Sequence, residues 1–67
     1  MYEVWYTASD NKDYLDSTYN RLISACVVAQ KVAKREGNAY VLAEDGFVED
    51  EYDCNGKSIL STVKIKK

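Results

Sequence analysis

Two glycine-containing dipeptides, Asp45-Gly46 and Asn55-Gly56, divide the second half of the chain into strand-length pieces. Both are typical of tight β-hairpins, because the central positions of a type I′ turn need positive φ angles, which glycine, asparagine and aspartate tolerate. The residues on either side alternate largely between apolar and polar, as half-buried strands do. The sequence therefore predicts an antiparallel meander of three strands at residues 39–44, 47–52 and 58–66.

Two-residue turns would also decide which side chains share a face of this sheet. One predicted face is mostly small and branched, so we expect it to face the core; it holds Ala39, Val41, Ala43, Val48, Tyr52, Ile59, Val63 and Ile65. The opposite face holds Tyr40, Leu42, Glu44, Phe47, Glu49, Glu51, Leu60, Thr62, Lys64 and Lys66. A one-residue bulge at either glycine would exchange the two sets in one strand.

Residues 2–7 are aromatic and β-branched and predict another strand, whereas residues 8–16 read as a polar loop. A helix is expected to begin near Asp16, Ser17 or Thr18, which are all competent N-caps, with an earlier start around Asp10 or Asp13 as an alternative. It should end at Glu36, with Gly37 as its left-handed stop. Its apolar stripe holds Leu22, Ala25, Cys26, Ala29, Val32 and Ala33. The alanines keep this stripe low, which leaves room for Tyr2, Tyr6 and Tyr52 beneath it.

These elements predict one α+β domain over residues 1–67, in the order β-α-β-β-β, with one helix packed on one face of a four-stranded mixed or antiparallel sheet. A right-handed crossover through the helix would make the first two strands parallel. The predicted core combines Leu22, Cys26, Ala29, Val41, Val48, Ile59 and Val63. One helix cannot cover both faces, so we expect an exposed apolar patch that contains Trp5, Tyr40, Leu42, Phe47 and Leu60.

The composition argues against catalysis. The chain has no histidine, which removes the commonest general base and the commonest neutral metal ligand. Residues 51–56 resemble the first half of an EF-hand calcium loop, but Thr62 stands where a bidentate glutamate is needed, and a hairpin explains the same residues. We therefore expect no enzymatic activity, no cofactor, no metal and no small-molecule substrate.

The same composition predicts a cytoplasmic protein. No apolar run approaches the ~20 residues of a membrane span, and no signal peptide is evident. Two cysteines are too few for a disulfide scaffold, and whether Cys26 and Cys54 can pair stays open.

Acidic residues cluster in the predicted hairpin region. Six of the eleven acids lie within ten residues that contain no lysine or arginine: Glu44, Asp45, Glu49, Asp50, Glu51 and Asp53. Same-side carboxylates on a strand are ~6.6–7 Å apart, close to the spacing of phosphates along a nucleic-acid strand. Glu49 and Glu51 therefore suggest nucleic-acid mimicry, although neutralisation by Lys64, Lys66 and Lys67 is an alternative. The net charge of −2 argues against direct nucleic-acid binding.

The sequence thus predicts a non-enzymatic protein-binding module that acts through an acidic strip and an open apolar sheet face. The expected contact residues are Trp5, Tyr40, Leu42, Phe47, Leu60, Glu44, Asp45, Glu49, Glu51 and Asp53. No residue motif identifies a family. In size and composition, tiny, tyrosine-rich, acidic and without proline or histidine, the chain resembles small accessory proteins of phages and mobile elements. This general resemblance suggests inhibition of a host protein, including one that binds nucleic acid. The alternative is a structural homo-oligomer that closes its open face on itself.

Overall fold

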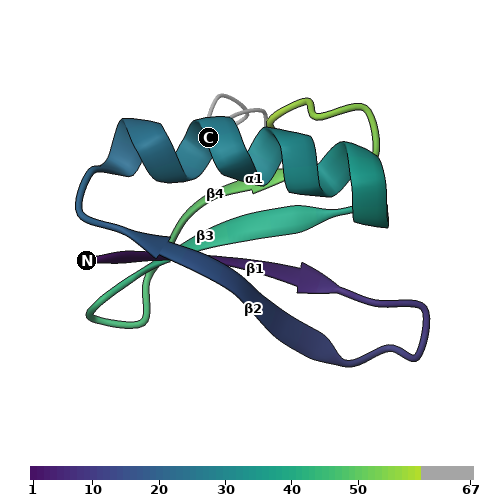
Figure 1. The fold of residues 1–67 in the computed structure, drawn as a ribbon, viewed down its shortest axis with the longest axis horizontal. Coiled ribbons are helices and arrows are strands. Elements are labelled where there is room, and N and C mark those ends of the chain that lie inside the picture. Colours follow the sequence, from purple (N-terminus) through teal and green to yellow (C-terminus); the bar gives the residue numbers. More distant parts are fainter. Residues whose placement is uncertain (60–67) are drawn as a thin grey trace.

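The computed structural model describes residues 1–59 (Figure 1). Its elements are β1 (Tyr2–Thr7), β2 (Asp13–Tyr19), α1 (Leu22–Glu36), β3 (Ala39–Ala43) and β4 (Val48–Tyr52). The strands form one antiparallel sheet in the order β2-β1-β3-β4, and α1 lies across one face of it. The predicted α+β class, with one helix on a four-stranded sheet, is confirmed. The element order is β-β-α-β-β, so the predicted β-α-β-β-β order is wrong.

The unexpected strand is β2, which replaces the predicted loop. It is joined to β1 by a tight turn in which the Ala8 amide donates to the Lys12 carbonyl at 2.9 Å and the Asn11 amide donates to the Ala8 carbonyl at 3.0 Å. Asn11 has a φ of 67°, a left-handed conformation that asparagine adopts more readily than most residues. Asp10-Asn11 therefore has the same turn chemistry as the two glycine dipeptides.

This hairpin changes how the strands are connected. β1 pairs antiparallel with both β2 and β3, so the predicted parallel pairing of the first strand with the strand after the helix is wrong. β2 and β3 consequently run in the same direction on either side of β1, and α1 connects them (Figure 1). The connection from β2 through α1 to β3 therefore crosses β1, which lies between these two strands.

Helix α1 begins later than predicted and ends where predicted. It cannot start near Asp16, because β2 extends to Tyr19, and its N-cap residue Arg21 makes no side-chain capping hydrogen bond. At the other end Gly37 has a φ of 106°, and its amide donates to the Ala33 carbonyl at 2.7 Å. This left-handed cap leaves basic residues in the last turn, where the helix dipole favours them.

The core lies between α1 and the sheet. Its buried residues are Val4, Ala25, Ala29, Val32, Ala33, Ala39, Val41 and Tyr52. The predicted low alanine face of the helix is therefore confirmed, and Tyr52, only 2% exposed, packs in the same cluster. Tyr2 and Tyr6 are partly buried against it. Of the predicted core, Ala29 and Val41 are buried and Cys26 packs against them.

Two other predicted core residues, Leu22 and Ile59, are 37% and 38% exposed, and Val63 lies outside the described residues. Val48 faces the other way, because the turn at Gly46 has three residues instead of two. The Gly46 amide donates to the Ala43 carbonyl at 3.0 Å, and the Ala43 amide donates to the Phe47 carbonyl at 2.8 Å. Val48 consequently pairs with Leu42, on the face away from the helix.

A bulge at Glu49 then restores the register, so that Val41 pairs with Asp50 and Ala39 with Tyr52, as predicted. The turn at Gly56 has the same three-residue form, with the Gly56 amide donating to the Asp53 carbonyl at 2.8 Å. Tyr52 therefore bridges to Ser58 rather than to the predicted Ile59. The rest of the predicted last strand, from Leu60 onward, lies outside the described residues.

Candidate functional site

The face of the sheet away from α1 collects side chains from all four strands. Directly opposed residues on neighbouring strands share a face, and one row across the sheet consists of Leu15, Trp5, Tyr40 and Glu51. The adjacent row consists of Thr18, Glu3, Leu42 and Val48. With the Thr7–Asp13 pair, these ten residues are called the open face below.

Hydrogen bonds fix both aromatic rings of the open face. The Trp5 Nε1 donates to Glu3 Oε1 at 3.0 Å, and the Tyr40 hydroxyl donates to Asp13 Oδ2 at 2.9 Å. The Thr7 hydroxyl donates to the other oxygen of Asp13 at 2.6 Å. Partial burial of the ring, followed by the hydrogen bond to Asp13, raises the pKa of Tyr40 to about 12. The rings are therefore held in place rather than free to swing into solvent.

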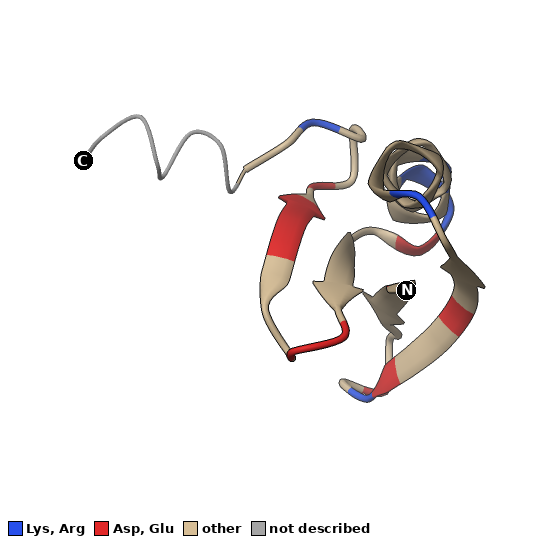
Figure 2. Cartoon of the chain, turned by 90° about the vertical axis from the view of Figure 1, so that its left-hand side faces the viewer, with Lys and Arg blue, Asp and Glu red and all other residues tan. Residues whose placement is uncertain are grey.

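Every lysine and arginine of the described residues lies outside the strands. The four strands contain no lysine or arginine and six acids, namely Glu3, Asp13, Asp16, Glu49, Asp50 and Glu51. In Figure 2, red segments lie both on the strands and in the turns, whereas blue segments lie only on α1 and the loops. Within residues 1–59, the open-face carboxylates of Glu3, Asp13 and Glu51 form no ion pair. Among the described residues, the negative charge of the open face is therefore not neutralised by ion pairs.

The structure brings together some of the predicted contact residues. Trp5, Tyr40, Leu42 and Glu51 share the open face. Others lie in turns: Glu44, Asp45 and the 61% exposed Phe47 surround Gly46, and Asp53 begins the turn at Gly56. Leu60 lies outside the described residues. The Asp53 carboxylate accepts hydrogen bonds from the amides of Asn55 and Lys57 at 2.9 and 3.0 Å, which supports the hairpin interpretation of this acidic stretch.

The prediction that Glu49 and Glu51 share one face of the sheet is wrong. The bulge removes Glu49 from the alternation, and Glu49 lines a hollow of about 330 Å³ together with the helix-facing residues Tyr2 and Ala43. Glu51 lies opposite Tyr40 on the open face. The carboxylates of that face come instead from three strands, so a regular strip with phosphate-like spacing does not form.

Asp13 and Leu15 belong to the open face but were absent from the predicted contact residues. Both lie on β2, which sequence reasoning assigned to a loop. Recognition of Asp10-Asn11 as a hairpin turn would have revealed them, because the alternation that follows places residues 13 and 15 opposite Thr7 and Trp5.

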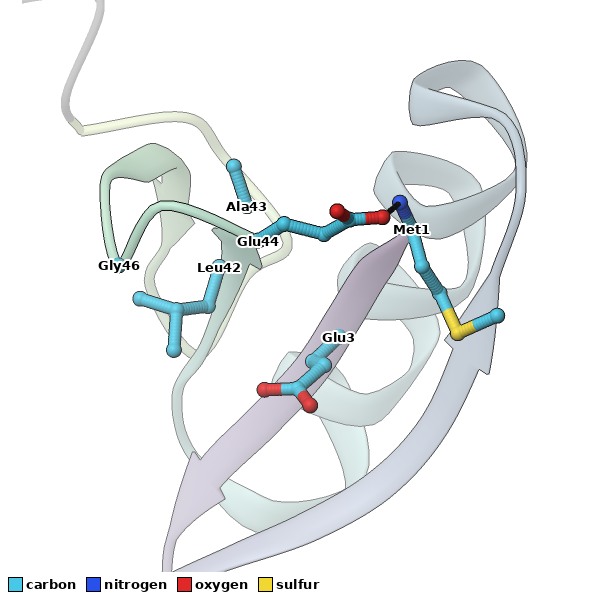
Figure 3. A pocket seen from close by; sticks show the side chains of 6 residues that line it. All are labelled: Met1, Glu3, Leu42, Ala43, Glu44 and Gly46. Atoms are coloured by element: carbon cyan, nitrogen blue, oxygen red, sulfur yellow. Dashed lines mark hydrogen bonds and ion pairs between the residues drawn. The ribbon is translucent and has the colours of Figure 1, made fainter.

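A second hollow of about 400 Å³ adjoins the open face (Figure 3). It is partly open to solvent and lined by Met1, Glu3, Leu42, Ala43, Glu44 and Gly46. The Met1 amino group pairs with the Glu44 carboxylate across its rim, and this hydrogen bond and charge lower the pKa of Glu44. Glu3 and Leu42, which are opposed across β1 and β3, connect the hollow to the open face.

Within residues 1–59, no group of three or more histidine, cysteine, aspartate or glutamate side chains is placed to hold a metal ion. Cys26 and Cys54 are both free thiols. No helix in this part of the chain is long and apolar enough to cross a membrane. No protein-family model, curated protein or solved structure matches the chain.

Proposed function

We propose that the chain is a non-enzymatic protein-binding module whose open face occupies a basic surface on another protein. The observation that carries this proposal is the pair of half-buried aromatic residues Trp5 and Tyr40 among three carboxylates that have no ion-pair partner within residues 1–59. Clustered aromatic side chains are typical anchors of protein interfaces. Unpaired charge beside them selects a partner of opposite sign and speeds its association.

The partner is best sought among proteins that bind nucleic acid, because these display basic surfaces that the open face would cover. The acids of the open face then imitate the charge of a nucleic acid but not its regular phosphate spacing. In this proposal the chain is a small cytoplasmic inhibitor of the kind carried by phages and mobile elements, and it acts by excluding nucleic acid from a host protein.

A second candidate function, a structural homo-oligomer, is favoured by a different surface. Face-to-face pairing of two open faces would bring Glu3, Asp13 and Glu51 against their own copies, which like-charge repulsion disfavours. On α1, however, Ile23 and Val27 lie one turn apart and are 72% and 48% exposed. Self-association would use this helical surface. Molecular mass measured against concentration, for the wild type and for Val27→Lys, detects it.

The test of the inhibitor proposal uses immobilised chain and a bacterial lysate, with elution by double-stranded DNA. We expect DNA to release captured proteins, because DNA and the open face compete for the same basic surface. The paired variants Glu51→Lys and Glu49→Lys make the same charge change on and off the open face, so only Glu51→Lys should abolish capture. Capture that survives both DNA and Glu51→Lys would contradict the proposal, and a mass that rises with concentration would favour the homo-oligomer.

A further inference from the structure

The row Leu15–Trp5–Tyr40–Glu51 places an aromatic pair next to a carboxylate. Trp5 and Tyr40 are directly opposed on β1 and β3, and Tyr40 is directly opposed to Glu51 on β4. Opposed side chains in a sheet have Cβ atoms about 4.5–5.5 Å apart, so the two rings and the carboxylate form one continuous strip. Hydrogen bonds to Glu3 and Asp13 occupy the polar atoms of the rings, and both side chains are partly exposed to solvent.

This arrangement has the chemistry that a guanidinium group requires. An arginine side chain stacks its flat cation on an aromatic face and directs two N–H donors to a carboxylate at the same time. A lysine ammonium is a compact, strongly hydrated charge, which gains less from a flat ring and must lose more water to reach it. The carboxylate at the end of the strip, Glu51, makes no ion pair within residues 1–59.

Other occupants fit the strip less well. Single-stranded RNA also stacks on sheet aromatics, but its phosphates would meet Glu3, Asp13 and Glu51, and β1–β4 contain no lysine or arginine to offset these acids. A second copy of the open face would bring the same three carboxylates. Charge complementarity therefore favours a cationic partner, and the aromatic pair favours arginine among the cations.

We infer that the Trp5–Tyr40–Glu51 strip is an arginine-recognition site for side chains displayed by a protein partner. This inference rests on the proposed function, because it names the chemistry by which the open face would select a basic surface. It predicts that partners present arginine rather than lysine at the centre of the contact. Lysines of the partner would lie around the edge, near Glu3 and Asp13.

The test compares two peptides of equal length and net charge, one of Arg-Gly-Ser repeats and the other of Lys-Gly-Ser repeats. Trp5 is the only tryptophan in the chain, so its fluorescence reports binding at the strip itself. We expect the arginine peptide to bind about fivefold more tightly or better at the same salt concentration, given the usual size of a cation–π contact.

Three variants separate the contribution of the aromatic ring to the affinity from that of the carboxylate. Tyr40→Leu removes a ring but no charge, so the ratio of the two affinities should fall towards unity. Glu51→Gln should weaken the arginine peptide by about threefold or more, whereas Glu49→Gln, an identical charge change off the open face, should have little effect. Circular dichroism of each variant confirms that the fold is retained before binding is measured.

The outcomes distinguish this inference from the function on which it rests. Equal affinity for both peptides, with the sensitivity to Glu51→Gln retained, would overturn arginine recognition while leaving a basic partner in place. Absence of binding by both peptides, measured by calorimetry as well as fluorescence, would overturn both proposals. Tighter binding of a single-stranded oligonucleotide than of the arginine peptide would show that the aromatic pair stacks bases instead.

Discussion

The two faces of the sheet differ in the size of their side chains and in how deeply these are buried. All eight buried residues of the core cluster lie between the sheet and α1 or on the buried face of α1, and seven of them are alanine or valine. No residue of the open face is fully buried, although that face carries the larger side chains Trp5, Tyr40 and Leu42. Small residues allow close approach of the helix and provide folding energy, whereas the large rings on the other side remain for contact with a partner.

Adjacent residues on β3 provide the most direct test of this difference. Val41 is fully buried under the helix, and Leu42 is half-buried on the open face. We expect Val41→Ala to lower the free energy of unfolding by about 2–3 kcal/mol, from lost burial and a residual cavity. Leu42→Ala should cost less than about 1 kcal/mol, although it removes more atoms. Urea unfolding of both variants measures this, and a larger cost for Leu42→Ala would reverse the assignment of the faces.

The fit of α1 on the sheet is tested by overpacking. Ala29 is fully buried, so Ala29→Leu should destabilise the fold by about 1–3 kcal/mol, because the added atoms force the helix away from the sheet. Lys31→Leu places the same side chain at an exposed position of the same helix and should be nearly neutral. If leucine is tolerated equally well at both positions, the helix does not pack as closely as its alanines indicate.

The three-residue turns at Gly46 and Gly56 have the same form, but only the turn at Gly56 lies against α1. Gly46 and Gly56 have φ angles of 84° and 76°, and alanine in such a conformation costs about 1–2 kcal/mol. At Gly56 an added Cβ would also lie 2.8 Å from Lys34 Cε and 3.3 Å from the Gln30 carbonyl oxygen, whereas at Gly46 it would meet nothing within 4 Å. We therefore expect Gly56→Ala to lower the thermal midpoint more than Gly46→Ala. Equal shifts would mean that the turn at Gly56 does not rest on α1.

The turns also explain how far the sequence could predict the fold. The sequence predicted the positions of both glycine turns, the end of the helix and the buried stripe of the helix, because each depends on local backbone conformation or on short-range periodicity. Turn length was harder to predict, because Asp-Gly and Asn-Gly suit both a two-residue turn and a three-residue turn with glycine in the left-handed position. That one-residue difference placed Val48 on the open face and paired Ser58, instead of Ile59, with Tyr52. A compensating bulge at Glu49 kept Val41 and Tyr52 in the core.

The candidate site was predictable only where it depended on alternation. Trp5, Tyr40 and Leu42 were placed on one face because β1 and β3 alternate regularly. Asp13 and Leu15 were not, since the left-handed residue of the first turn is Asn11 instead of glycine and the strand after it is rich in aspartate and serine, which propensity assigns to loops. Pairing with β1 overrides that propensity over seven residues.

The smallest effect expected is on titration rather than on stability. On the open face, partial burial and the acceptor Asp13 raise the pKa of Tyr40 to about 12, above its ordinary value of 10.0. Because the folded state favours the protonated phenol, its stabilising contribution is fully present below pH 10 and is lost as the pH rises through about 12. The difference in absorbance near 295 nm between the wild type and Tyr40→Phe should therefore titrate above the range of an ordinary tyrosine.

Two further variants assign the cause of this shift. Asp13→Asn removes the charged acceptor and should lower the pKa of Tyr40 towards its ordinary value. The Asp10 carboxylate accepts a hydrogen bond from the Tyr14 hydroxyl at 2.7 Å, and this bond raises the pKa of Tyr14. Asp10→Asn therefore changes the environment of Tyr14 and should leave the pKa of Tyr40 unchanged. A Tyr40 difference signal that already titrates near pH 10 in the wild type would show that its ring stands free in solvent. The open face would then lose the fixed aromatic pair that distinguishes it from an ordinary solvated surface.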